Sequence, residues 1–487
     1  MRSDRTPLGE RILDQARDRP AAPALVWHGQ ETSYGHLHHR TQAQRTRLER
    51  VEPEFDRPLG IWAAKSPEAV ALVLACLCDE RPFLLLPTDL PSDTATDLAR
   101  KAGCRFILPA TGDPEQVHTP EEWTRQRIPD GTTFMLTTSG STGRPKIVPL
   151  GGAAVGRFMD WAGPAFDLGP GTTVLNHAPL SFDLCLFDIW TSLAHGARVV
   201  LVDPEYAAQG RHLLKLIVTH EVTVMQAVPM AYGLLLDAAR AADTPLAGVR
   251  HAIVTGDVLP ERTHAGLTWL LPRARAHNVY GCTETNDSFR HEITGTETHR
   301  DGGLPIGSPI PGVRALVLDD NGEEVTHAGT GELYVCTPFQ SEGYLDRGLR
   351  SDAFLSHPLG RDERQWYRTG DLVRREADGS IRLLGRVDFQ VKIRGVAVNL
   401  AEVERTLLSH PDVLEAGVTT VPDPVAGRAL LSVIRRTQES ELTSLSLRRH
   451  CVQRLPRAFV PTNFRVLDEA LPRTSTGKVD RTALDRL

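Results

Sequence analysis

Strand-like and helix-like segments alternate between residues 172 and 260, and this alternation constrains the fold more than any other feature of the sequence. The β-branched runs are VLNHAPL, ARVVLVD, VTVMQAV and HAIVTG, and the helix-like stretches RHLLKLIVTH and MAYGLLLDAARAA lie between them. Strands that alternate with helices are typical of a layered α/β architecture with largely parallel sheets. The first 130 residues alternate in the same way, with a buried helix expected at Pro67–Cys78 and a short strand at 83–86.

A different pattern begins near residue 300. The short strands VRALVLDD, GELYVCT and SIRLLGR are separated by Asp-Asn-Gly and Ala-Asp-Gly turns, which predicts a small β-barrel-like subdomain on the α/β part. An α+β unit follows from about Asp388, with a strand expected at VKIRGVAV and a capping box at Asn399 and Glu402. The chain of 487 residues is too long for one ordinary domain, so we expect two, 1–387 and 388–487, joined by a short hinge.

Charge and cysteine content exclude several kinds of partner. The 55 basic and 61 acidic residues give a formal charge of −6 and are mixed along the chain, so no basic block could follow a nucleic acid backbone. Seven scattered cysteines favour reduced thiols in a cytoplasmic protein. The sequence has neither a secretory signal nor an uninterrupted run of about 18 apolar residues, so we expect no membrane partner.

Residues 137–146, TTSGSTGRPK, form the most informative segment. Its small residues allow backbone N–H groups to approach an anion, its hydroxyls add donors, and Lys146 supplies a positive charge. The segment differs from a Walker loop because Arg144 and Pro145 separate the last glycine from the lysine. Taken alone, it predicts either a phosphate-binding loop or a Gly/Ser-rich surface turn.

Further motifs follow in a defined order along the chain. They are TSYGHL (32–37), NVYGCTE (278–284), GELYV (331–335), YRTGDL (367–372), GRVDFQVKIRG (385–395), LPRAFVP (455–461) and STGKVDR (475–481). With the loop at 137–146, these motifs resemble those of the adenylate-forming superfamily, which contains acyl-CoA synthetases, luciferases and nonribosomal-peptide adenylation domains. The resemblance covers essentially the whole chain and is greatest to a stand-alone amino acid adenylation enzyme.

The resemblance implies an ATP site in the first domain. Glu284 would bind the Mg²⁺ that accompanies ATP, as a hard oxygen ligand, and Thr283 would contact the phosphates. Tyr280 would stack on adenine, and Asp371 would accept the ribose hydroxyls. The full set of implied ATP-binding residues is Thr138, Ser139, Gly140, Ser141, Thr142, Gly143, Lys146, Gly256, Asp257, Asn278, Val279, Tyr280, Gly281, Asp371 and Arg386.

Lys478, in the second domain, would be the catalytic cation that bridges the substrate carboxylate and the α-phosphate. A carboxylate that attacks a phosphate brings two anions together, and a preorganised positive charge lowers that barrier. Only six lysines occur in the chain, and three of them, Lys146, Lys392 and Lys478, lie in motifs. The resemblance also implies a rotation of the second domain at Asp388, after which Lys392 and Gly395 would face the site for transfer to a thiol.

The segment SFDLCLFDIW (181–190) bears on the acid that is activated. In amino-acid-activating relatives an Asp at the position of Asp183 binds the substrate α-ammonium, and the alternative is that Asp183 caps the following helix. The resemblance places the side-chain pocket at Leu184, Phe187, Gln226, Ile253, Thr255, Val279, Asp287 and Ser288. The polar members Gln226, Asp287 and Ser288 suggest a modest side chain with a hydrogen-bonding or cationic group.

These features predict an enzyme that adenylates an amino acid with ATP and Mg²⁺ and passes it to a separate phosphopantetheinyl carrier protein. The chain ends soon after STGKVDR, so we expect the thiol acceptor to come in trans. An acyl-CoA or aryl-CoA ligase stays open, since Cys282 replaces the proline typical of amino acid activators, and Ile147 replaces a usual glycine. A nucleotide-binding protein that kept the fold without the chemistry is the alternative from another class.

Overall fold

The structure is a computed structural model of residues 1–487. It describes residues 7–55, 57–117, 128–138, 145–297, 304–319, 321–346, 353–387, 390–424, 427–437, 440–472, 479 and 483–484. No helix in this part of the chain is both long and apolar enough to cross a lipid bilayer.

The first layer is a six-stranded sheet in the order β6-β5-β3-β4-β7-β8. Its strands are β3 (Leu59–Ile61), β4 (Phe83–Leu85), β5 (Phe106–Leu108), β6 (Glu115–Gln116), β7 (Thr132–Thr138) and β8 (Lys146–Gly151), accompanied by α1 (Leu8–Asp18), α2 (Tyr34–Val51), α3 (Pro67–Cys78) and α4 (Ser92–Lys101). Helix α3 has the predicted bounds. It begins at the Ser66 cap and is buried on almost every side, because it is apolar all round.

A second, larger sheet carries the predicted alternation. Its path is β16-β17-β19-β20-β15-β14-β13-β12-β11-β9-β10-β1-β2, and the pairs from β1 through β10, β9, β11 and β12 to β13 are parallel. The strands of this part are β1 (Pro23–Trp27), β2 (Gln30–Ser33), β9 (Thr173–Asn176), β10 (Arg198–Leu201), β11 (Val224–Ala227), β12 (His251–Thr255), β13 (Arg275–Cys282) and β14 (Asn286–Ile293). Helices α6 (Gly152–Ala165), α7 (Ser192–Ala194), α8 (Gly210–Thr219), α9 (Pro229–Ala241) and α10 (Glu261–Leu270) connect them.

The expected β-barrel-like subdomain is present as an antiparallel extension of this sheet. It contains β15 (Pro305–Pro309), β16 (Arg314–Leu318), β17 (Gly329–Cys336), β18 (Phe354–Leu355), β19 (Trp366–Arg375) and β20 (Ile381–Arg386). Strand β15 pairs with both β14 and β20, so hydrogen bonding is continuous from the α/β part into this subdomain. The pairing covers the edge of β14, which would otherwise expose unpaired backbone groups.

The C-terminal α+β unit contains β21 (Gln390–Ile393), β22 (Val396–Asn399), α12 (Leu400–Leu408), β23 (Val413–Asp423), β24 (Gly427–Arg436), α13 (Ser444–Val452) and β25 (Asn463–Leu467). The single strand expected at VKIRGVAV is wrong. Arg394 and Gly395 have φ values of 52° and 80°, and this left-handed pair turns the segment into the tight β21–β22 hairpin. Strand β25, which the sequence analysis did not predict, pairs in parallel with β24.

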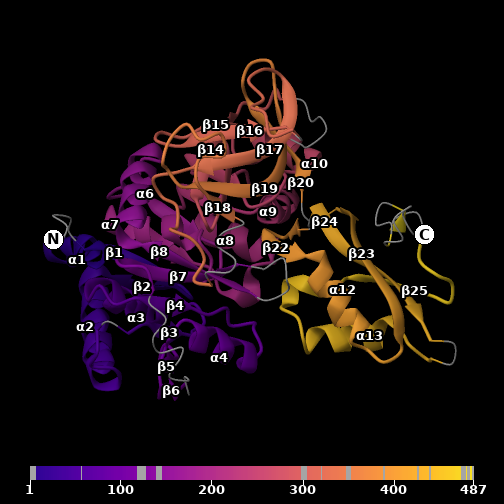
Figure 1. Ribbon diagram of the computed structural model, residues 1–487. Coiled ribbons are helices and arrows are strands. Elements are labelled where there is room, and N and C mark those ends of the chain that lie inside the picture. The colour runs from indigo at the N-terminus through magenta and orange to yellow at the C-terminus, as the bar shows by residue number, and fades with distance from the viewer. Residues whose placement is uncertain are drawn as a thin grey trace.

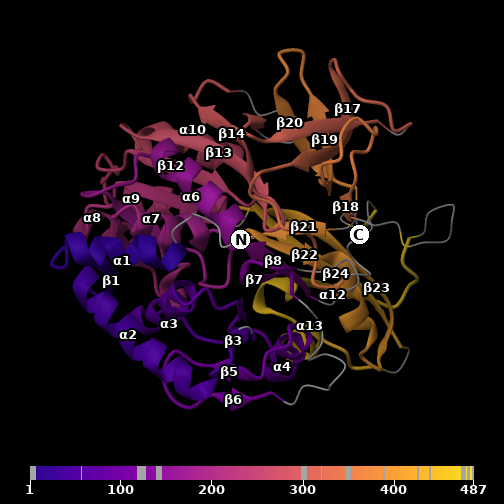
Figure 2. The same ribbon diagram turned by 60° about the vertical axis from the view of Figure 1, so that its left-hand side comes forward.

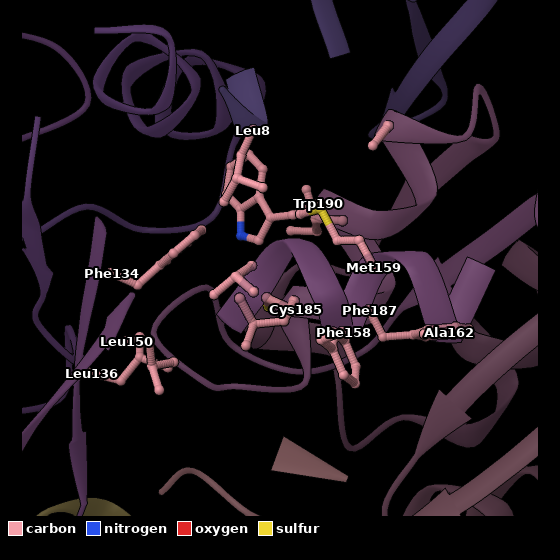
Figure 3. Close-up of a cluster of buried hydrophobic side chains, with 14 of the residues drawn as sticks. Leu8, Phe134, Leu136, Leu150, Phe158, Met159, Ala162, Cys185, Phe187 and Trp190 are labelled. Carbon is pink, nitrogen blue, oxygen red and sulfur yellow. The ribbon is translucent and has the colours of Figure 1, made fainter. Parts of the chain in front are cut away.

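One hydrophobic core joins the two layers and fixes a π-helix at Leu186–Thr191. Figure 3 shows Trp190 of this helix in the cluster with Leu8 and Phe134, and the rings of Trp190 and Phe134 lie 6.1 Å apart. The C-terminal unit lies beside the large domain in Figure 1, and Figure 2 shows the β21–β22 hairpin on the side that meets it. The core therefore positions the π-helix segment. The C-terminal unit lies against the large domain and contributes residues to the cavity between them.

Candidate active site

A cavity of about 860 Å³ lies between the large domain and the C-terminal unit. Its walls include Thr138, Gly256 and Asp371 from the large domain, and Lys392 and Gly395 from the β21–β22 hairpin. Thr255 ends β12 and Gly256 follows it, so this wall lies at the carboxyl end of a parallel strand. Ligands of open α/β sheets bind at that edge. The cavity is large enough for a nucleotide and a small acid.

The predicted phosphate and magnesium residues meet at one corner of the cleft. Thr138 and Lys146 face each other across the β7–β8 pair. Thr138 Oγ1 donates to Glu284 Oε1 at 3.5 Å, and the Tyr344 hydroxyl donates to the same oxygen at 2.8 Å. The Lys146 Nζ lies 4.4 Å from the centre of the Tyr344 ring. The predicted loop residues 139–143 lie outside the described residues.

Tyr344 is a site residue that our sequence reasoning missed. It connects the carboxylate of Glu284 with the cation of Lys146, and burial raises the pKa of its hydroxyl above the usual range. The hydroxyl therefore stays protonated and acts as a donor. The sequence offered only a Gly-Tyr-Leu run shortly after the GELYV motif, and that run does not indicate a contact with the distant Glu284.

Glu284 fits a magnesium ion that arrives with a nucleotide. No group of three or more His, Cys, Asp or Glu side chains within the described ranges forms a metal cage. Mg²⁺ bound to phosphates needs only one or two protein carboxylates, because phosphate oxygens and water complete its octahedron. Glu284 is 6% exposed and lines the cleft beside Thr138 and Lys146, so a single hard oxygen ligand is available where phosphates would lie.

The residues expected around adenine and ribose also come together. The Tyr280 hydroxyl donates a short hydrogen bond to Asp371 Oδ2, and Asn278 Nδ2 donates to the Pro305 carbonyl at 2.8 Å. Asp257 Oδ1 accepts from the Val258 N–H at 2.8 Å, and burial raises its pKa to about 6. Gly256, Gly281 and Asp371 line the cleft, whereas Asn278, Tyr280 and Asp257 lie just behind its wall. The side chain of Arg386 lies outside the described set, although its backbone pairs with Asp371.

Asp183 also lines the cleft, close to the corner that contains Glu284. Its Oδ2 accepts from Thr283 Oγ1 at 2.7 Å, so Thr283 contacts the predicted ammonium ligand. Burial and the charge of Glu284 raise the pKa of Asp183, and the Thr283 hydrogen bond and the charge of Lys392 oppose that shift. The π-helix begins without a side-chain cap, so the geometry does not support the helix-capping alternative.

A buried polar network lies near Asp183, and of its members only Gln226 was predicted from the sequence. Gln226 Nε2 donates to Asp188 Oδ1 at 3.0 Å, and Asn176 Nδ2 donates to Asp188 Oδ2 at 3.1 Å. Burial raises the pKa of Asp188 to about 8 and lowers that of the nearby Lys65 to about 8. Lys65 donates to the backbone carbonyls of Asn176 and His177. Asp188 is the second acid of SFDLCLFDIW, and that repeated Phe-Asp pair was the available signal.

The other predicted pocket residues divide into two groups. Leu184, Phe187, Gln226, Thr255 and Asp287 line the cleft with Asp183. Ile253, Val279 and Ser288 are buried and lie outside the lining, and Ser288 donates within its own turn to the Asn286 carbonyl at 3.4 Å.

The β21–β22 hairpin sits directly against the large domain. A Cβ atom built on Gly395 would lie 2.2 Å from Val228 Cγ1, and one built on Gly256 would lie 3.6 Å from Gly395 Cα. Asp388 and Lys478, the predicted hinge and catalytic residues, lie outside the described residues. Val479 packs with Leu431 and the other members of a small cluster on the β23–β24–β25 sheet.

This chain belongs to the AMP-binding enzyme family, whose model matches residues 12–345, and the model of the AMP-binding enzyme C-terminal domain matches residues 402–478. It is 32% identical, over 98% of its length, to a dimodular nonribosomal peptide synthase of Bacillus subtilis, of which it spans 21%. It is 34% identical to an L-proline–[L-prolyl-carrier protein] ligase of Pseudomonas fluorescens, over 74% of this chain and 69% of the relative.

Solved structures share the two-domain fold. The amide bond synthetase McbA from Marinactinospora thermotolerans superimposes with a TM-score of 0.85 at 22% identity, over 98% of this chain and 99% of that one. The Vibrio cholerae adenylation domain AlmE, solved in complex with glycyl-adenosine-5'-phosphate, superimposes with a TM-score of 0.83 at 21% identity. The match covers 100% of this chain and 98% of that one. The predicted fold class and the resemblance to adenylate-forming enzymes are thereby confirmed.

Proposed function

We propose that this chain is an AMP-forming ligase that adenylates an amino acid with ATP and transfers it to the phosphopantetheine thiol of a separate carrier protein. The observation that carries the proposal is Asp183, a half-buried carboxylate that lines the same cleft as Thr138, Lys146 and Glu284. A buried carboxylate needs a charged partner, and a substrate ammonium is a suitable one. Two L-proline–[L-prolyl-carrier protein] ligases, the second from Streptomyces coelicolor and 30% identical over 96% of this chain and 94% of its own, support carrier loading.

In the first half-reaction a carboxylate oxygen of the amino acid bonds to the α-phosphorus of ATP, and pyrophosphate leaves. Lys146 would neutralise phosphate charge from the large domain, and Lys478 would supply a cation between the two reacting anions. Glu284 would hold Mg²⁺, which when bound neutralises charge on the phosphates. Asp183 would fix the α-ammonium and so orient the carboxylate toward the nucleotide.

In the second half-reaction the thiolate sulfur bonds to the acyl carbon, and AMP leaves. In the observed position of the C-terminal unit, Lys392 and Gly395 of the β21–β22 hairpin line the cleft. This position supports a role for the hairpin in thiol transfer. We propose that rotation at Asp388 exchanges this arrangement for one in which Lys478 reaches the nucleotide.

Substrate-dependent exchange of pyrophosphate into ATP, measured over a panel of amino acids and of acids without an amine, tests the proposal. Exchange that depends on an amino acid, followed by transfer to a phosphopantetheinylated carrier protein and not to free CoA, is the expected result. Exchange only with acids lacking an amine would replace the proposal with an acyl-CoA or aryl-CoA ligase. ATP binding without any exchange would indicate a non-catalytic nucleotide-binding protein.

Replacing Gly395 with alanine should slow acyl transfer to the carrier protein by about 10-fold or more, because small displacements of reacting groups cost that much. The new Cβ would overlap Val228, and φ is 80° at this position. Single-turnover transfer from preformed adenylate measures the effect. Gly379→Ala is the matched control, since Gly379 also has a positive φ but its Cβ would meet no atom within 4 Å. Equal transfer rates in Gly395→Ala and Gly379→Ala would contradict a role for the contact between the hairpin and the large domain.

A further inference from the structure

Three carboxylates lie on or just behind the cleft wall at the predicted side-chain pocket. Asp183 and Asp287 line the cleft, Asp188 is buried behind Gln226, and each of the three has a raised pKa with burial as its main cause. Asp188 is fully buried and is compensated by the amides of Asn176 and Gln226 and by the charge of Lys65. Asp183 accepts a hydrogen bond from Thr283 and is stabilised by the charge of Lys392. The protein therefore provides polar partners for two of the three carboxylates.

Asp287 differs from the other two carboxylates. It lines the cleft from the start of β14, and no described residue forms a hydrogen bond or an ion pair with its side chain. The acidic groups Asp183 and Asp188 face it, and Lys65 and Lys392 act on those two acids instead. Asp287 is half-buried, and a partly desolvated carboxylate without a partner costs the fold some stability. Such a group is retained where a ligand supplies the missing positive charge.

Gln226 gives a second, independent indication of the ligand's chemistry. Its Nε2 donates both to Asp188 Oδ1 and to the Leu184 carbonyl at 3.1 Å, which fixes the orientation of the amide because both neighbours accept. The side chain is 2% exposed and lines the cleft, and within the described part of the chain its Oε1 has no donor. Gln226 therefore offers the pocket an acceptor, as Asp287 does.

We propose that the side-chain pocket selects an amino acid with a basic side chain, whose second cation pairs with Asp287 and donates to Gln226 Oε1. The inference rests on the proposed amino acid adenylation and adds the substrate class. Asp183 would pair with the α-ammonium, and Asp287 would pair with the second ammonium or guanidinium. Leu184 and Phe187 would pack on the methylene groups between the two cations. A neutral side chain would leave Asp287 unpaired and its desolvation uncompensated.

Pyrophosphate exchange with paired substrates tests this inference. The pairs are lysine with norleucine, ornithine with norvaline, and arginine with citrulline, and proline is included as a single neutral amino acid. The wild-type enzyme should use the basic member of at least one pair with a kcat/KM higher by about 10- to 100-fold, as expected for a hydrogen bond to a charged group. In Asp287→Asn that ratio should fall toward one. Glu292→Gln, an exposed position on the same strand, should leave it unchanged.

The pH dependence separates a charge effect from a structural one. Because the pKa of Asp287 is about 7 in the folded protein, the basic-to-neutral ratio of kcat/KM should rise as the pH increases through 7. Asp183 is common to both substrates, so its titration cancels in the ratio. An acid whose pKa is raised by folding costs stability above its unfolded pKa. Asp287→Asn should therefore have an equal or higher Tm than the wild type at pH 8, and a lower Tm would overturn the inference.

The outcomes distinguish failure of the inference from failure of the proposed function. Exchange with neutral amino acids that is as fast as with basic ones, and unchanged in Asp287→Asn, would overturn the inference and leave amino acid adenylation intact. Faster exchange with hydroxyl- or amide-bearing amino acids such as homoserine or glutamine would overturn it in favour of a neutral hydrogen-bonding role for Asp287. Exchange with no amino acid would overturn both.

Discussion

Replacing Lys478 with alanine is expected to reduce amino-acid-dependent pyrophosphate exchange by on the order of 10²–10³-fold or more, because the variant lacks the cation between two reacting anions. Acyl transfer to the carrier from preformed aminoacyl adenylate should survive, since that step joins a thiolate to a neutral acyl carbon. Separate assays of the two half-reactions give both values. Lys215→Ala is a suitable control, because Lys215 lies on α8, is exposed and is absent from the cleft lining.

The two-step comparison makes the Lys478 prediction specific. A variant that lost exchange and transfer together would indicate a general structural defect. Exchange near the wild-type rate would remove Lys478 from the chemistry, and with it the need for a rotation that brings the C-terminal unit to the nucleotide. An intact first step would then have to rely on other cations of the cleft wall, such as Lys146.

Local patterns predicted the elements of the fold well, and long-range contacts were the part that they could not predict. Helix α3 was predicted with its observed bounds because its signal is local, an apolar run that follows a Ser cap and an N-terminal proline. The β21–β22 hairpin was missed because Arg394 adopts a positive φ, which is uncommon for a residue other than glycine. Nothing local distinguishes such a turn from a continuous strand.

The site shows the same division. Asp183 and Asp287 were assigned from motifs, and both line the cleft. Tyr344 and Lys65 were missed, because each acts through partners distant in sequence: Tyr344 through Glu284, and Lys65 through the carbonyls at the end of β9. A tyrosine near a turn and a lysine before a helix have many ordinary explanations. Only the packing of the two sheets brings these groups to one cleft.

Replacing Asp183 with asparagine should lower kcat/KM for the amino acid substrate by about 10²-fold or more, the usual effect of removing one member of a buried charge pair. The amide can still accept from Thr283, which donates to Asp183 in the wild type, so the local structure should persist. Stability should not fall, because burial raises the pKa of Asp183 and the ionised group therefore costs stability above its unfolded pKa. A thermal melt at pH 8 checks that the variant is folded.

The substrate that lacks only the α-amine provides the decisive comparison for Asp183. The wild type should strongly prefer the amino acid over its des-amino analogue, whereas Asp183→Asn should discriminate little between them, because the variant has lost the charge that the ammonium pairs with. The preference of the wild type should also weaken as the pH falls through the raised pKa of Asp183, and the variant should lack this dependence. If both acids lost activity equally in the variant, Asp183 would act on the architecture of the cleft rather than on the ammonium, and the assignment of an amino acid substrate would lose its main support.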